Sequence, residues 1–374
     1  MKPLRIFLIA GESSGDTHGA LLIRELAALH PNIEFFGAGG PEMRAIAGDQ
    51  LMEWTHEAAV VGVWDVLVKW PYFKENFNRI YQMIRQLNPD AVIFVDFPGF
   101  NLRLAKYLRR KGYTRKLIYY ISPQVWAWNR GRISKMARVL DLMMCIFPFE
   151  KEIYESSGLR TEFVGHPMVE ELKQHRILVP RDPKLIALLP GSRSREIKRI
   201  FPVMLEAARL LQKKDSSIWF EVSATSTAAS ESMQQLVAES RVANVKIQVR
   251  NSKELMQRAV VGMVASGTAT MESSFFQLPF ALIYKVSWFT YIPGRLLIRV
   301  NYLGMPNILG GKEIIPEFIQ HGALPERIAG TIWTLYSDPE ARAAMVQELD
   351  HVVSLLKEKN PANRPAEVVL RALQ

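Results

Sequence analysis

Three loops of small residues each follow directly on an apolar, strand-like run, and they constrain the fold more than any other feature of the sequence. They are Gly11-Glu12-Ser13-Ser14-Gly15-Asp16, Pro190-Gly191-Ser192-Arg193 and Ala265-Ser266-Gly267-Thr268-Ala269-Thr270-Met271-Glu272. Glycine and serine keep bulky side chains out of such a loop, so backbone N–H groups at the start of the following helix can receive a phosphate or sugar oxygen. Three such loops, divided between two halves of the chain, predict a ligand-binding cleft.

Short β-rich runs alternate with longer helical patterns in both halves, and this alternation predicts parallel sheets covered by helices. The expected strands are Leu4–Ala10, Ile33–Gly37, Ala91–Val95, Lys116–Ile121, Leu142–Ile146 and Glu162–Val164 in the first half, and Leu185–Leu189, Ile218–Val222, Val245–Val249, Val260–Val264 and Phe280–Tyr284 in the second. The first helix is expected from about Asp16 to Leu29, where Pro31 ends it. The predicted fold class is α/β, with two similar Rossmann-like domains that face each other.

The length of the chain supports two domains. Its 374 residues, 48% of them hydrophobic, exceed the roughly 250 residues at which single cores usually stop growing. We expect an N-terminal domain over 1–170 and a C-terminal domain over 171–349. A polar, proline-punctuated stretch from Lys173 to Pro183 is expected to link them, and a helix over about 350–374 is expected to pack back on the first domain.

Charge and cysteine content narrow the classes of partner. The formal charge of +10 favours an anionic partner, such as a nucleotide, a phosphorylated substrate or an acidic membrane surface. Nucleic acid is the least favoured of the anionic partners, because the sequence has no zinc-finger spacing, RNA-binding aromatic signature or basic tail. Cys145, the one cysteine, lies in an apolar run and is expected to be a buried thiol in a reducing compartment.

Neither a membrane span nor a metal site is expected. No apolar stretch approaches the roughly 20 residues that cross a bilayer, and the apolar start of the chain is interpreted as a first strand instead of an export signal. The seven histidines are scattered without a metal-ligand pair, so no metal or other cofactor is predicted.

Asp96 is the leading catalytic candidate. It follows the apolar run Ala91–Val95, and ligands of open parallel sheets bind at the carboxyl ends of strands. Phe97 and Phe100 would partly desolvate its carboxylate, raise its proton affinity and allow it to remove a proton from an alcohol. The alternative is an aspartate that caps a helix or stabilises a turn.

The loops of the second half offer nucleotide-binding candidates. Arg193 follows a strand and precedes a helix, so its guanidinium can hold a diphosphate in two-point contact, although a solvated basic turn is the alternative. In the 266–272 loop the small residues allow close approach, and Glu272 can accept both hydroxyls of a ribose. A capped helix start, with Glu272 compensating the helix dipole, is the alternative there.

A continuous apolar segment, Val60–Trp70, carries the membrane hypothesis. It is interpreted either as a buried helix or as a patch, flanked by Lys69 and Lys74, that enters a membrane interface or receives an acyl chain. The aromatic and basic stretch from Trp288 to Arg299 favours the interfacial interpretation. The expected membrane or acyl contacts are Val63, Trp64, Leu67, Val68 and Trp70.

Seven motifs taken in order resemble the lipid A disaccharide synthase family over almost the whole chain. They are Gly11–Asp16, Asp96-Phe97-Pro98-Gly99-Phe100-Asn101, Ser122-Pro123-Gln124-Val125-Trp126-Ala127-Trp128, Phe163-Val164-Gly165-His166-Pro167, Leu189–Arg193, Ala265–Ala269 and Met305-Pro306-Asn307. The resemblance implies a peripheral-membrane glycosyltransferase of the GT-B fold, with two domains facing across a cleft. It would transfer diacylglucosamine from UDP-2,3-diacylglucosamine to the 6-hydroxyl of 2,3-diacylglucosamine 1-phosphate, with inversion and release of UDP, on the cytoplasmic face of the inner membrane.

The resemblance also implies roles for individual residues. Asp96 would be the general base and Arg193 would stabilise the diphosphate. The expected nucleotide-binding residues are Ser192, Ser266, Gly267, Thr268, Ala269, Glu272 and Asn307, and the expected acceptor-side residues are Gly11, Glu12, Ser13, Ser14, Gly15, Asp16, His18, Gln124 and Trp126. One departure is Gly99, where many family members carry a second aspartate; it argues against a mechanism that needs an acidic pair.

Three other functions stay open from the sequence. A nucleotide-sugar epimerase or the related peptidoglycan glycosyltransferase would share the fold and the UDP loops, because fold alone does not decide function. A non-catalytic nucleotide-binding protein that docks on anionic membranes is the third, and it would not need Asp96. A homodimer, with or without exchanged C-terminal helices, also stays open.

Overall fold

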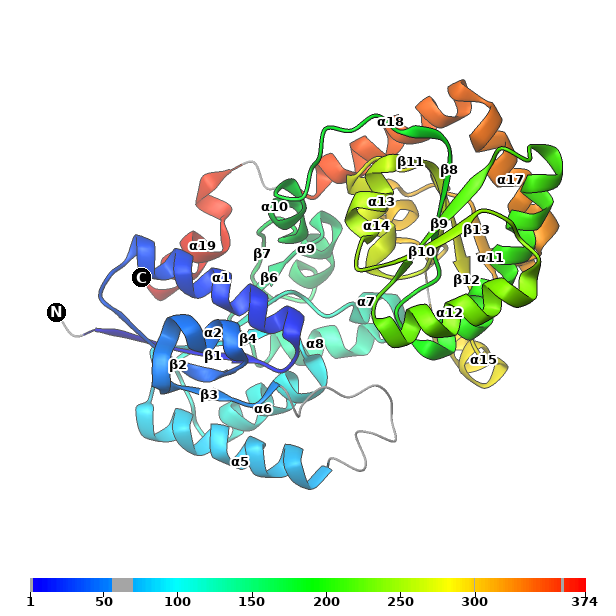
Figure 1. Ribbon diagram of the computed structural model, residues 1–374. Coiled ribbons are helices and arrows are strands. Elements are labelled where there is room, and N and C mark those ends of the chain that lie inside the picture. Colours follow the sequence, from blue (N-terminus) through cyan, green and yellow to red (C-terminus); the bar gives the residue numbers. More distant parts are fainter. Residues whose placement is uncertain (1–2, 56–69, 299, 358–359) are drawn as a thin grey trace. The chain divides into compact units, whose positions relative to one another are not determined.

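The computed structural model describes residues 3–55, 70–298, 300–357 and 360–374. The chain divides into two compact units. Unit 1 comprises Met1–Pro167 together with Glu358–Gln374, and unit 2 comprises Met168–Lys357. Both units are parallel-sheet α/β structures, as the alternating pattern predicts (Figure 1).

Unit 1 is built on a parallel sheet of seven strands in its described residues, in the order β3-β2-β1-β4-β5-β6-β7. The strands are β1 (Leu4–Ala10), β2 (Ile33–Gly39), β3 (Leu51–Glu53), β4 (Ala91–Val95), β5 (Lys116–Tyr120), β6 (Leu142–Cys145) and β7 (Thr161–Phe163). The helices are α1 (Ser13–Leu29), α2 (Pro41–Ala47), α5 (Trp70–Leu87), α6 (Pro98–Arg110), α7 (Val125–Trp128), α8 (Ile133–Ala137), α9 (Pro148–Glu155) and α19 (Pro365–Leu373). In Figure 1, α1 and α5 cover opposite faces of this sheet.

The described residues of unit 2 form a second parallel sheet, of six strands in the order β10-β9-β8-β11-β12-β13. They are β8 (Asp182–Leu189), β9 (Trp219–Ala224), β10 (Val245–Val249), β11 (Ala259–Ala265), β12 (Phe280–Tyr284) and β13 (Glu317–Ile319). Its helices are α10 (Met168–Lys173), α11 (Ser194–Lys214), α12 (Thr227–Ser240), α13 (Ser252–Arg258), α14 (Thr268–Phe275), α15 (Trp288–Leu297), α16 (Met305–Gly310), α17 (Pro325–Ser337) and α18 (Pro339–Leu355). Helix α11 packs on α12 and α17, and α13 packs on α14 (Figure 1).

The strand order reverses once in each sheet, and this sets the position of the functional loops. In unit 1 the chain moves outward from β1 to β2 and β3, then returns to place β4 on the other side of β1, so that Ala10 is paired with Val95. In unit 2 the same reversal places β11 beside β8, with Val264 paired to Leu189. Open parallel sheets bind ligands where the strand order reverses, outside the carboxyl ends of the strands.

The C-terminal segment is divided between the two units. Helix α18 packs on α14, α16 and α17 of unit 2, whereas α19 packs on α1 and β5 of unit 1. Arg371 of α19 lies 3.8 Å from Glu162 in β7. The helical segment expected over about 350–374 therefore begins in the last turns of α18 in unit 2 and ends in α19 of unit 1.

The observed elements differ from the predicted pattern in two missed strands and in the ends of several others. Strands β3 and β13 were not expected, since each has three residues and no alternating pattern. Helix α1 begins at Ser13, three residues before the expected start. The strand expected to run to Ile121 ends at Tyr120, because Ile121 has φ +67°, which is not an extended conformation.

Cys145 is buried at the end of β6, and burial raises the pKa of its thiol well above the usual value. In the part of the chain that the structure describes, no helix combines the length and the apolar character that crossing a bilayer requires.

Candidate active site

The carboxyl ends of β1 and β4 place the Gly11–Asp16 loop and Asp96 side by side in unit 1. The two strands are neighbours in the sheet, and both are buried along the paired residues. Gly11 and Glu12 connect β1 to helix α1, whose first turn contains the rest of this motif, and Asp96 and Phe97 connect β4 to helix α6. The first two predicted motifs therefore meet at the point where the strand order reverses.

Asp96 and Phe97 both adopt a left-handed backbone, which non-glycine residues rarely do. Their φ angles are +47° and +50°, and each such residue costs about 1–2 kcal/mol. Three hydrogen bonds hold the turn: Asp96 N–H donates to the carbonyl of Tyr120 at 2.9 Å, and the Asp96 carbonyl accepts from Asn101 Nδ2 at 2.7 Å and the Tyr119 hydroxyl at 2.6 Å. Strain held this firmly at a strand end is typical of functional sites.

The Asp96 carboxyl group is tuned to hold and release a proton near neutral pH. Its pKa is raised from 3.8 to about 6, first because burial penalises the charged form and second because the negative charge of Glu12 lies nearby. A hydrogen bond from the backbone of Phe97 opposes this rise. Proton transfer is most efficient when the pKa of the base lies near the operating pH, so this carboxylate can act as a general base.

Gly11 is required by the close approach of the Phe97 ring. A Cβ atom at position 11 would lie 2.2 Å from Cδ1 of Phe97. Any larger residue would therefore push the ring, and with it the strained turn that carries Asp96. The absence of a side chain at Gly11 therefore allows the turn that positions the predicted base.

The other residues expected on the acceptor side fall into two groups. Glu12, Ser13, Ser14 and Gln124 are exposed, and His18 is partly exposed. Asp16 and Gly15 are buried. The Asp16 carboxylate accepts hydrogen bonds from the backbone N–H groups of Gly40, Glu42 and Met43, at 2.8, 2.9 and 3.1 Å. Asp16 therefore anchors the start of helix α2.

Trp126 is buried, and its position depends on Glu150, which the sequence reasoning missed. Glu150 is fully buried and accepts from Trp126 Nε1 at 2.8 Å, from the Ser122 hydroxyl at 2.5 Å and from the Phe147 backbone at 3.2 Å. Burial raises the pKa of its carboxyl to about 7, against the opposing effect of these hydrogen bonds. Glu150 therefore holds residues 122–128 from their buried side, while Gln124 lies at the surface.

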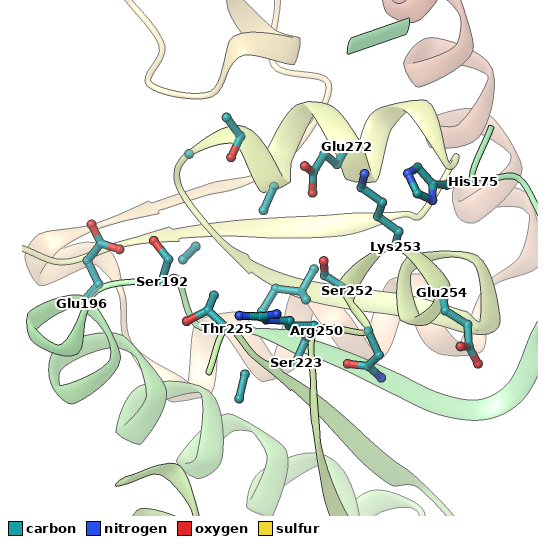
Figure 2. Close-up of a pocket in the computed structure, with 18 of the residues that line it drawn as sticks. His175, Ser192, Glu196, Ser223, Thr225, Arg250, Ser252, Lys253, Glu254 and Glu272 are labelled. Atoms are coloured by element: carbon teal, nitrogen blue, oxygen red, sulfur yellow. The ribbon is translucent and has the colours of Figure 1, made fainter. Parts of the chain in front are cut away.

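A pocket of about 790 Å³ lies at the carboxyl ends of the unit 2 strands. Figure 2 labels ten of its side chains, which come from a strand end, from loops and from the helices that follow them. The lining residues are Gln174, His175, Ile177, Leu189, Gly191, Ser192, Glu196, Ser223, Ala224, Thr225, Arg250, Asn251, Ser252, Lys253, Glu254, Ala265, Ser266, Gly267, Thr268, Ala269 and Glu272. Two of the three small-residue loops thus form part of one pocket.

The backbone of these loops is shaped for a ligand to approach closely. Gly191 has φ +102° and Gly267 has φ +149°, values that other residues rarely adopt. Gly267 precedes helix α14 directly, with no atom within 4 Å of a Cβ built on it. The start of this helix therefore offers backbone N–H groups and a positive dipole end to an anion.

Arg193 is exposed at the start of helix α11 and does not line the pocket itself. Its side chain is 67% exposed and pairs with Glu196 at 3.2 Å. Glu196 does line the pocket and also accepts from the Arg193 backbone at 3.4 Å. The guanidinium is thus held beside the pocket by a surface ion pair, which is weak enough to be exchanged for a ligand.

Two cations of the pocket follow β10: Arg250 lies in the loop, and Lys253 lies in the first turn of helix α13. Arg250 has φ +58°, and Figure 2 shows its guanidinium between Thr225 and Ser252. Lys253 extends toward Glu272 in the same view and pairs with Glu171 at 2.7 Å. Burial raises the pKa of Glu272, while the positive charge of Lys253 lowers it. The pocket therefore combines anion-binding groups with a partly buried carboxyl group.

The stretch expected to be an interdomain linker is part of this pocket. Gln257 accepts from Ile177 N–H at 2.9 Å and donates to the carbonyl of His175 at 2.9 Å. These two bonds fix residues 174–177 against helix α13, where Gln174, His175 and Ile177 line the cavity. Part of the expected interdomain linker therefore contributes to the wall of this cavity.

Asn307 is not among the lining residues, although it was expected to bind the nucleotide. It is fully buried, and its amide accepts from Ile314 and Ile315 N–H and donates to the Ile315 carbonyl and to Glu317. These four bonds occupy the side chain. Asn307 instead holds the loop that leads into β13.

Most of the residues expected to contact a membrane or an acyl chain lie outside the described residues. They are Val63, Trp64, Leu67 and Val68, whereas Trp70 begins helix α5 and is half-exposed. Within the described ranges, no group of three His, Cys, Asp or Glu side chains is arranged to hold a metal ion.

Comparison with known proteins identifies the family. The lipid-A-disaccharide synthetase family matches residues 6–370 of this chain. The lipid-A-disaccharide synthase of Persephonella marina is 37% identical over 380 residues, which cover 98% of each protein. The chain belongs to the lipid-A-disaccharide synthetase family. It is a glycosyltransferase of lipid A biosynthesis, as the seven motifs predict.

Solved structures of other proteins share the fold of this synthetase family member. The UDP-GlcNAc 2-epimerase of Neisseria meningitidis, solved with UDP-GlcNAc bound, has a TM-score of 0.63 at 11% identity and covers 99% of both chains. A glycosyltransferase from Rickettsia africae has a TM-score of 0.57 at 12% identity and covers 100% of this chain and 99% of its own. These likenesses support the predicted GT-B architecture of two parallel-sheet domains.

Proposed function

We propose that this family member transfers 2,3-diacylglucosamine from UDP-2,3-diacylglucosamine to the 6-hydroxyl of 2,3-diacylglucosamine 1-phosphate, with inversion and release of UDP. The observation that carries the proposal is Asp96: a carboxylate with a pKa of about 6, on a strained turn at the strand-order reversal of unit 1. Nucleotide binding alone has no need of such a group.

The uridine nucleotide is assigned to the 790 Å³ pocket of unit 2. The start of helix α14, with Ser266, Gly267, Thr268 and Ala269, receives diphosphate oxygens through its backbone N–H groups. Glu272 accepts the ribose hydroxyls. Ser192 and Arg193 stand at the start of helix α11, where the guanidinium can exchange Glu196 for a phosphate. A negative charge that develops on the leaving UDP is thereby stabilised by fixed positive groups.

The chemistry at Asp96 is a proton transfer coupled to substitution. The carboxylate removes the proton of the acceptor 6-hydroxyl, and the oxygen forms a bond to C1 of the donor sugar as the bond from C1 to the UDP oxygen breaks. UDP leaves with the electron pair, and attack from the opposite face inverts C1. Gly11, Glu12, Ser13, Ser14 and Gln124 stand on the acceptor side in this proposal.

The proposed location is the cytoplasmic face of the inner membrane, with the protein bound peripherally. The formal charge of +10 supports attraction to an anionic surface. The diacylated substrates of the proposed reaction also require a lipid phase. Binding to vesicles with and without anionic lipid tests the location separately from the chemistry.

Chromatography of the uridine product tests the reaction. Incubation with UDP-diacylglucosamine and diacylglucosamine 1-phosphate in detergent is expected to release free UDP only when the acceptor is present. An epimerase would keep the sugar on UDP with or without acceptor, and a binding protein would leave the donor unchanged. Either of these results would refute the proposal.

A further inference from the structure

A second pocket, of about 400 Å³, lies in unit 1 and differs in character from the nucleotide pocket. Its described lining is Trp70, Phe73, Lys74, Phe77, Phe97, Gly99, Phe100 and Arg103. Five of these eight residues are aromatic. The volume lies within the range of about 300–1,000 Å³ that is common for small-molecule sites, whose walls are mostly apolar.

The pocket is built by helices α5 and α6 and by the turn that carries Asp96. Helices α5 and α6 are in contact with each other. Phe100 joins the two sides, with ring centroids 6.5 Å from Phe73, 5.6 Å from Phe77 and 6.1 Å from Phe97. Phe97 directly follows Asp96 in the chain, so one wall of the apolar pocket adjoins the proposed base.

Two cations accompany these aromatic walls. Arg103 lies over the ring of Trp70, 5.8 Å from its centroid, and Lys74 lies one turn further along helix α5. Both cationic side chains are exposed. Apolar walls with positive charges fit an amphiphile that has an apolar chain and an anionic head.

We propose that this pocket binds one fatty acyl chain of the acceptor and so selects the acceptor by chain length. The inference rests on the proposed function, which supplies a diacylated, phosphorylated acceptor whose hydroxyl group must reach Asp96. A chain seated against Phe97 and Phe100 fixes the sugar beside the carboxylate, with Arg103 and Lys74 available to the phosphate group.

Gly99 sets the space available to the chain. It lines the pocket in the first turn of helix α6, and a Cβ built on it meets no atom within 4 Å. A larger side chain there enters open space without colliding with the protein. Gly99→Leu should therefore shorten the pocket while the fold is retained.

The kinetic test measures KM and kcat for acceptors with acyl chains of increasing length, in wild type, Gly99→Leu and Gly330→Leu. Gly330 is the matched control, because it lies in helix α17 of unit 2 and a Cβ there also meets no atom within 4 Å. Each methylene denied to the pocket should raise KM about fourfold. Gly99→Leu is expected to raise KM for long-chain acceptors and leave KM for short-chain acceptors unchanged, while Gly330→Leu matches wild type.

A binding measurement separates failure of this inference from failure of the proposed function. The fluorescence of cis-parinaric acid, an acyl chain without a sugar, is titrated with each protein below its micelle concentration. Saturable binding by wild type and Gly330→Leu, weakened at least about tenfold in Gly99→Leu, supports an acyl pocket even if no disaccharide forms. Equal binding by all three proteins, or equal KM at every chain length, would overturn the inference. So would a Gly99→Leu defect seen only with lipid vesicles, because the pocket would then meet the bilayer.

Discussion

The hydroxyl of Tyr119 donates a hydrogen bond of 2.6 Å to the backbone carbonyl of Asp96. Tyr119 lies in β5, fully buried, and Asp96 directly follows the neighbouring strand β4. The bond therefore comes from the rigid sheet and holds the left-handed turn without engaging the carboxylate oxygens. The sheet positions the proposed base through its backbone and leaves its side chain available for chemistry.

Tyr119→Phe removes this hydroxyl and nothing else. The Asp96 carbonyl keeps its bond from Asn101, so the expected loss of stability is about 0.5–1.5 kcal/mol. We expect kcat to fall several-fold with KM nearly unchanged. Tyr113→Phe is the matched control, since its hydroxyl donates to the Pro89 carbonyl at 2.8 Å, away from Asp96. Equal kcat in the two variants would show that the Tyr119 bond is only structural.

Asp96→Asn should make the protein more stable at alkaline pH. The folded pKa is about 6, above the ordinary value of 3.8, so the folded state holds a proton that the unfolded state releases between these pH values. Wild type therefore loses stability as the pH rises through 6, by up to about 3 kcal/mol. Denaturant unfolding should show Asp96→Asn more stable than wild type at pH 8 and equal to it near pH 4. An unchanged difference between the proteins at pH 4 and pH 8 would contradict the raised pKa.

Arg193→Ala should weaken UDP binding without weakening the fold. Its ion pair with Glu196 is exposed and contributes at most about 1 kcal/mol to stability. A lost hydrogen bond from a charged group to the diphosphate should reduce affinity about 10- to 100-fold in calorimetric titration with UDP. Arg195→Ala, an exposed neighbour outside the pocket lining, is the control. Equal UDP affinities in the two variants would remove Arg193 from the nucleotide site.

Glu150→Gln should weaken the hydrogen bonds that hold residues 122–128, on the proposed acceptor side, in place. The amide group of glutamine cannot accept hydrogen bonds at both oxygen positions, so one of the bonds from Ser122, Phe147 or Trp126 is lost at a cost of about 1–3 kcal/mol. If the loop 122–128 contacts the acceptor, KM for the acceptor should rise while KM for the UDP-sugar stays constant. Ser122→Ala, which removes one donor only, should have a smaller effect. Equal changes in both KM values would argue against the loop's role.

Much of the fold was predictable because the strands are strongly apolar and regularly spaced. All residues of Ala91–Val95 are buried, and such runs are recognisable without knowledge of their neighbours. Strands β3 and β13 were missed, since three residues carry too little pattern. They form through pairing with β2 and β12, which depends on the assembled sheet.

The candidate site was predictable where a residue follows a strand directly, and not where tertiary contacts decide. Asp96 and Ser266 are recognisable from the apolar runs before them. Arg250 also follows a strand, but its place in the pocket depends on a left-handed backbone that its own sequence does not indicate. Asp16 belongs to an expected substrate loop, yet three backbone N–H groups of a separate segment converge on it.

The rate of disaccharide formation is the measurement we would make first. Wild type and Asp96→Asn are compared from pH 5 to 9, with both diacylated substrates in detergent. Wild-type activity should fall below about pH 6, as the base becomes protonated, and Asp96→Asn should be at least about 100-fold slower at every pH. A variant that forms disaccharide at the wild-type rate would contradict the assignment of Asp96 as the general base.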